Sequence, residues 1–116
     1  MLTLPIKKKW LDMILSGEKK EEYREIKPYY ETRFMNLFGI IACGGEYLKC
    51  SNIGLSECEK DEIQTIRFRN GYSKISPSFV AKCTLSVGTG KEEWGAEKGK
   101  QYFILTIHEI LKGSEG

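Results

Sequence analysis

Apolar side chains recur at helical spacing in the segment that precedes Gly17. Between residues 8 and 16 they are Trp10, Leu11, Met13, Ile14 and Leu15. This spacing predicts a short amphipathic helix with one face against a core. Gly17 stands where a left-handed residue closes the last turn of a helix. We therefore expect the chain to turn sharply at Gly17.

Alternation of apolar and polar residues predicts strands elsewhere in the chain. It is visible from Leu2 to Ile6, directly after the Gly17 turn, and from Gln64 to Arg69, where Ile66 and Phe68 alternate with two arginines. Asn70-Gly71 predicts a hairpin whose return strand begins around Pro77, and a last strand runs from Tyr102 to Ile110. A second short helix is expected to start at Pro28. Residues 39–60 give weak signals, and we expect a long loop after a short strand over Ile40–Cys43.

Positive charge is concentrated in the middle of the chain. The net charge of the 116 residues is only +2, yet residues 64–91 hold Arg67, Arg69, Lys74, Lys82 and Lys91 and no acidic residue. A cluster of this kind is what a phosphate-bearing partner requires. An ordinary solvated face is the alternative interpretation of the same charges.

The cysteines and the single histidine give no metal-binding pattern. Cys43, Cys50, Cys58 and Cys83 include no closely spaced pair, and His108 lies in an alternating strand segment. Reduced, buried thiols are the interpretation we prefer over a structural zinc, and we expect no metal or cofactor. The sequence has neither a membrane-length apolar run nor a signal-peptide core, so we expect a cytoplasmic protein that does not interact with membranes.

The residues after the first helix carry the candidate chemistry, in the pattern Gly17-x-Lys19-x-x-Glu22-x-Arg24. In a strand, Glu22 and Arg24 project from one face, so the carboxylate can hold the guanidinium. Lys19 is three residues before Glu22 and reaches the same face only if it lies in the turn. A Glu22–Arg24 ion pair with a purely structural role is the alternative to a ligand site.

This motif resembles the signature of the ASCH domain family, whose fold is similar to the RNA-binding PUA domain. Two further segments, Phe68-Arg69-Asn70-Gly71-Tyr72-Ser73 and Trp94-Gly95-Ala96, resemble a small bacterial and phage branch of that family. The resemblance covers nearly all of residues 1–116, which we interpret as a single domain. We therefore expect a mainly β (α+β) fold, a PUA-like β-barrel of five or six strands with two or three short helices, the first helix packing across one opening.

The resemblance implies an RNA- or nucleotide-binding domain with a basic cleft lined by Lys19, Glu22 and Arg24. Arg67 and Arg69 are further candidates for holding phosphate, and Tyr23, Tyr72 and Trp94 are candidates for stacking on bases. Interleaved basic and aromatic residues suit single-stranded RNA or a nucleotide better than duplex DNA. The identity of the ligand and the oligomeric state stay open.

A hydrolase is the alternative function for the same cleft, with Lys19 and Glu22 as the catalytic residues. Some ASCH relatives are amidohydrolases of acylated cytidine nucleosides such as N4-acetylcytidine, and others cut RNA. In the amidohydrolases the position of Glu22 is a threonine nucleophile, so that mechanism does not transfer, and this chain has no clear counterpart of their downstream glutamate. Water attack assisted by Glu22 is the remaining form of the hypothesis. A protein-interaction module, the third possibility, would instead show an exposed apolar patch and an uncharged cleft.

Overall fold

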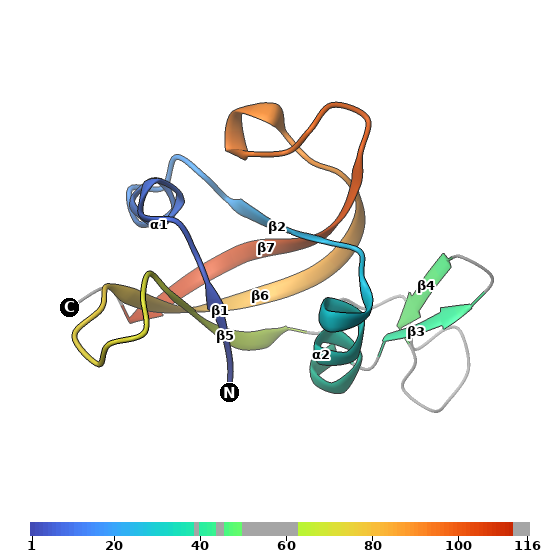
Figure 1. Cartoon of the computed structure of the whole chain (residues 1–116), viewed down its shortest axis with the longest axis horizontal. Helices are drawn as coiled ribbons and strands as arrows, with labels where there is room; N and C mark the ends of the chain where they lie inside the picture. Colours follow the sequence, from blue (N-terminus) through green and yellow to red (C-terminus); the bar gives the residue numbers. More distant parts are fainter. Residues whose placement is uncertain (39, 44–45, 50–62, 113–116) are drawn as a thin grey trace.

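The computed structural model describes residues 1–38, 40–43, 46–49 and 63–112 (Figure 1), and for 40–43, 46–49 and 112 the description covers the backbone alone. Its elements in chain order are β1 (Leu2–Pro5), α1 (Lys8–Leu15), β2 (Glu21–Glu25), α2 (Pro28–Phe38), β3 (Ile40–Cys43), β4 (Glu46–Lys49), β5 (Gln64–Arg69), β6 (Ser78–Thr89), the 3-10 turn η2 (Glu92–Trp94) and β7 (Gln101–Lys112).

Five of these strands form one mixed sheet in the order β1-β5-β6-β7-β2. β1 pairs with β5 in parallel, and the other neighbours are antiparallel. The sheet curls strongly into a half-barrel (Figure 1), and two register shifts between the long strands β6 and β7 are irregularities of the kind that bend strands. The predicted α+β class, with a five-stranded curled sheet and two short helices, is confirmed.

Both helices close the core on one face of the sheet. α1 contributes Leu11 and Ile14, and α2 contributes Phe34 and Phe38. These side chains form one buried cluster with sheet residues such as Phe103. Gly17 follows α1 with φ +86°, so the predicted left-handed exit from the helix is confirmed.

A smaller cluster lies on the other face of β2 and β7. Tyr23, Tyr102, Ile104 and Ala96 are buried there, and Trp94 packs against them. Ala96 and Trp94 belong to the segment between β6 and β7, which therefore covers this part of the sheet. The protein thus buries both faces of β2, which is an edge strand.

The predicted hairpin joins β5 to β6, with residues 70–77 as its connection. Ile66 and Phe68 are completely buried, whereas Arg67 and Arg69 are half-buried, as the alternation predicts. The connection is longer than a two-residue turn. The Asn70 side chain donates to the carbonyl of Ile6, which lies between β1 and α1, so the hairpin is attached to the β1–α1 junction.

The weakly patterned stretch is described only in part. β3 and β4 form an antiparallel pair, so the short strand expected over Ile40–Cys43 is present. The expectation of a loop directly after Cys43 is wrong at Glu46–Lys49, which form β4. Residues 50–62 and the thiols of Cys43, Cys50 and Cys58 lie outside the described residues. Cys83 is a buried free thiol. No helix in the described part of the chain has the length and apolar character that spanning a bilayer requires.

Candidate functional site

Lys19 lies in the turn between α1 and β2, the position from which it can reach Glu22. Its backbone N–H donates to the carbonyl of Met13, which folds the turn back onto α1. The ammonium group donates to the carbonyls of Glu21 (2.6 Å) and Trp94 (2.9 Å) and lies 3.0 Å from Oε1 of Glu22. Three polar partners thus surround a group that carries three protons.

Burial dominates the electrostatics of this lysine. The Lys19 side chain is 0% exposed and that of Glu22 is 5% exposed. Loss of solvation lowers the pKa of Lys19 below its ordinary value, and the Glu22 carboxylate opposes this shift by stabilising the charged ammonium. The rings of Trp10 and Tyr23 flank the ammonium at 5.1 Å and 4.9 Å, which further favours the cation.

Arg24 holds the other oxygen of Glu22 and connects the two edge strands. Its Nη1 lies 3.1 Å from Oε2 of Glu22 and donates to the carbonyl of Tyr23 at 2.8 Å. Its Nη2 donates to the carbonyl of Pro5 at the end of β1. The guanidinium therefore bridges the open side of the half-barrel, where no backbone ladder joins β1 to β2.

The free edge of β2 is partly occupied by these same side chains. Lys20 accepts a hydrogen bond from the N–H of Ile107 in β7, so the alternate carbonyls of Glu21 and Tyr23 point to the free edge. Lys19 and Arg24 donate to those two carbonyls. Because N–H and C=O of one residue point the same way in an antiparallel strand, the N–H of Tyr23 also faces this edge.

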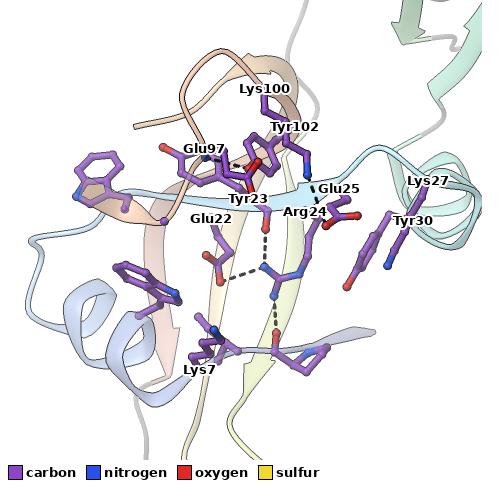
Figure 2. A pocket seen from close by; sticks show the side chains of 15 residues that line it. Lys7, Glu22, Tyr23, Arg24, Glu25, Lys27, Tyr30, Glu97, Lys100 and Tyr102 are labelled. Carbon is purple, nitrogen blue, oxygen red and sulfur yellow. Dashed lines mark hydrogen bonds and ion pairs between the residues drawn. The ribbon is translucent and has the colours of Figure 1, made fainter. Parts of the chain in front are cut away.

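A pocket of about 440 Å³ opens along this edge (Figure 2). It lies among β2, the β1–α1 junction, the start of α2 and the segment before β7. Its charged lining residues are Lys7, Arg24, Lys27, Lys100, Glu22, Glu25 and Glu97, and its aromatic lining residues are Trp10, Tyr23, Tyr30, Trp94 and Tyr102. The pocket is therefore aromatic and mixed in charge, with cations only slightly in excess.

The segment before β7 is held against β2 by several polar contacts. The Tyr23 hydroxyl donates to Oε1 of Glu21 (2.7 Å) and accepts from the N–H of Lys91 (2.9 Å). The hydroxyl of Tyr102 accepts from the N–H of Glu97 at 3.0 Å. Burial of the Tyr23 ring is the main reason that the pKa of its hydroxyl lies above the ordinary value. These contacts fix one wall of the pocket.

The structure brings together only some of the residues that the sequence nominated. Glu22, Tyr23, Arg24 and Trp94 line the pocket, and Lys19 does not, although its ammonium contacts Glu22 and the carbonyl of Trp94. Arg67, Arg69 and Tyr72 are not among the lining residues. Tyr72 is 96% exposed in the β5–β6 connection. A ligand would have to extend beyond this pocket to contact these three, and their part in binding stays a prediction.

Other lining residues were not nominated from the sequence. The pattern assigns Trp10 and Tyr30 to the packed faces of two helices, and both do pack against the core cluster while also lining the pocket. Lys27 precedes α2 and Lys100 precedes β7, and both side chains line the pocket. A single lysine before a helix or a strand gives no sequence signal that it will line a pocket.

The described residues do not suggest a metal centre, since no group of three histidine, cysteine or acidic side chains lies together among them. Comparisons with protein-family models, curated proteins and solved structures found no match to this chain. The chemistry of the pocket therefore has to be interpreted from its own residues.

Proposed function

We propose that this chain is an ASCH-like domain that binds RNA or a nucleotide-derived ligand in the pocket beside β2. The observation that carries the proposal is the joint presence of Glu22, Arg24 and five aromatic rings around one pocket of about 440 Å³. That volume falls in the usual range for small-molecule sites. The curled sheet with two short helices supports the resemblance at the level of fold alone.

The pocket offers the kinds of contact that a nucleotide uses. Aromatic faces such as those of Tyr30 and Trp94 are suited to stacking on a base. The N–H of Tyr23 is a backbone donor for a base carbonyl, and the Arg24 guanidinium has more N–H groups than the three contacts described above occupy. Lys7 and Lys27 are exposed cations at the wall of the pocket, suited to a phosphate.

The charges favour one nucleotide inside the pocket over a long electrostatic track. Three lining carboxylates accompany four lining cations, and one of them, Glu25, lies 3.6 Å from Lys100. Tight nonspecific binding of a nucleic-acid backbone needs many unopposed cations. Recognition in this pocket therefore rests on stacking and hydrogen bonding, with a modest dependence on salt.

The hydrolase alternative is favoured by one observation, the 3.0 Å approach of Lys19 to Glu22. Convergence of a base and a carboxylate is what such chemistry requires. Against it, the Lys19 ammonium already has three polar partners, and both oxygens of Glu22 are held by cations. We therefore place binding first and keep turnover as an outcome of the test.

The test is a calorimetric binding screen of the four ribonucleoside 5′-monophosphates, N4-acetylcytidine and a short single-stranded RNA, with recovered ligands analysed by chromatography. Tyr30→Leu should weaken binding of the monophosphate that binds best, because it removes a lining ring. Tyr72→Ala is the matched control and should leave that affinity unchanged. Absence of binding to every probe, or equal effects of the two variants, would reject the proposal. A cleaved or deacylated product that is lost in Glu22→Gln would establish the hydrolase instead.

A further inference from the structure

A continuous aromatic ladder runs from the core to the surface of α2 beside the pocket. Phe34 lies edge-on to the core residue Phe103 at 5.1 Å and stacks with Tyr30 at 5.8 Å between ring centroids. Tyr30 in turn meets the exposed Tyr29 edge-on at 4.9 Å. Each ring is held by the one beneath it, so the outermost ring is fixed to the core.

Arg33 completes this ladder on the outside. Its guanidinium carbon lies 3.5 Å from the centroid of the Tyr29 ring, and its Nη1 donates to the Tyr29 carbonyl at 3.1 Å. Both side chains are exposed. A guanidinium that is stacked on a ring and held by a backbone bond presents a flat, pre-ordered cationic surface, on which a base can stack.

The pair of Tyr29 and Arg33, here called the α2 platform, adjoins the pocket through Tyr30. Tyr30 lines the pocket and its ring also contacts that of Tyr29. Lys27 also lines the pocket at the start of α2, with its ammonium 5.4 Å from the centroid of the Tyr30 ring. Figure 2 places Lys27 and Tyr30 together at the α2 side of the site. A chain that leaves the pocket along α2 would pass a cation and then reach a stacking surface.

We propose that the ligand is a single-stranded oligonucleotide, with one nucleotide in the pocket and the next base stacked on the Arg33 guanidinium of the α2 platform. This inference rests on the proposed function and adds a second subsite to it. Lys27 then neutralises the phosphate between the two nucleotides. The alternation of cation and ring, Lys27 with Tyr30 and Arg33 with Tyr29, favours a nucleic acid over an acidic protein segment, because every nucleotide pairs one phosphate charge with one planar base.

The experiment compares calorimetric affinities for the 5′-monophosphates pA, pC, pG and pU with those for the dinucleotides pApA, pCpC, pGpG and pUpU. With the unaltered protein, the best dinucleotide should bind about tenfold more tightly than its monophosphate, in line with the contribution of one stacked base. Arg33→Lys keeps the positive charge but removes the planar guanidinium on which a base would stack. It should bring the dinucleotide affinity down to that of the monophosphate and leave the monophosphate affinity unchanged.

Lys82→Ala is the control for a general effect of positive surface charge, because it removes one half-exposed cation from β6, outside the pocket lining. It should not change the ratio of dinucleotide to monophosphate affinity. Equal affinities of the unaltered protein for both ligand lengths, or an unchanged ratio in Arg33→Lys, would overturn the α2 platform while the pocket stands. Failure of every nucleotide to bind would overturn the proposed function, and the second subsite with it.

Discussion

The Nζ atom of Lys19 lies 3.0 Å from Oε1 of Glu22, although the two side chains come from a turn and a strand and are almost completely buried. Arg24 lies 3.1 Å from the other oxygen of the same carboxylate. Burying charges of this kind is unfavourable unless each one is paired and hydrogen-bonded. Here Lys19 also donates to the carbonyl of Trp94, and Arg24 donates to the carbonyl of Pro5 at the end of β1. The ion cluster therefore connects the walls of the pocket.

Replacing Lys19 with Met should lower the free energy of unfolding by about 3 kcal/mol, because the Glu22 carboxylate then stays buried with one cation fewer. Urea titrations followed by tryptophan fluorescence measure this. Lys8→Met is the matched control, since Lys8 pairs with Asp12 but both side chains are 56% exposed, and it should change stability by less than about 0.5 kcal/mol. Equal effects of the two substitutions would show that the buried cluster contributes nothing special to stability.

Local signals in the sequence predicted both helices and most strands, but not β4, whereas the site needed contacts between distant segments. The exit at Gly17 and the alternation around Phe68 follow from backbone and burial rules that act within a few residues. The contact between Lys19 and Trp94 joins residues 75 positions apart. No periodicity specifies such a partner. From the sequence, Lys19 was expected to reach Glu22 only if it lay in the turn after α1, and it does lie in that turn.

Aromatic residues gave the least specific signal. Tyr30 follows the helical pattern of a core residue, and it does pack on the core, yet one side of its ring lines the pocket. A half-buried ring of this kind satisfies both interpretations, so only the three-dimensional arrangement distinguishes them. The same holds for Trp10, which packs on the core and lines the pocket. Its ring would lie 3.0 Å from a Cβ atom at Gly95, whose φ of +103° also favours glycine.

Gly90→Ala should loosen the wall that carries Trp94. A Cβ atom there would lie 2.6 Å from Cζ of Tyr23 and 2.8 Å from Cβ of Ala96, closer than packed atoms approach. We expect a loss of about 1–3 kcal/mol in stability from this overpacking and weaker nucleotide binding. Thermal unfolding and calorimetry measure the two effects.

Gly88→Ala provides the comparison for that substitution, two residues earlier and inside β6, whereas Gly90 follows the end of that strand. A Cβ atom at Gly88 would lie 3.6 Å from Cδ1 of Ile104, an ordinary contact distance. Stability and binding should therefore stay close to those of the unaltered protein. If Gly90→Ala also kept its stability and binding, the close packing of the segment before β7 against Tyr23 would not be needed for nucleotide binding.

Alkaline pH should destabilise the protein in part through Cys83. Burial raises the pKa of this thiol from 9.0 to about 12, so the folded state keeps a proton that the unfolded state releases. Its contribution to stability is complete below pH 9 and is lost as the pH rises toward 12. Between pH 8 and pH 10 the unaltered protein should lose about 1 kcal/mol more than Cys83→Ala. Urea titrations under reducing conditions test this.

The comparison with Cys83→Ala isolates the thiol from two other shifted groups. The lowered pKa of Lys19 makes stability increase as the pH rises toward the ordinary value of 10.5, because the unfolded state binds the extra proton. The raised pKa of Tyr23 acts in the opposite direction, at pH values above its ordinary value of 10.0. Both groups are common to the two proteins. Parallel pH profiles would mean that the Cys83 thiolate is not disfavoured by burial.

Arg24 and Arg67 should differ sharply in their importance for binding a single nucleotide. Arg24→Lys cannot reproduce the simultaneous contacts with Glu22, Tyr23 and Pro5, because an ammonium lacks the planar fork. We expect about tenfold weaker binding of a 5′-monophosphate and a lower melting temperature, so calorimetry has to be done well below that temperature. Arg67→Ala should stay within about twofold of the unaltered protein, as a change of one charge outside the pocket. A loss of affinity in Arg67→Ala with none in Arg24→Lys would place the nucleotide on the dibasic face of β5, and the pocket beside β2 would then have a structural role only.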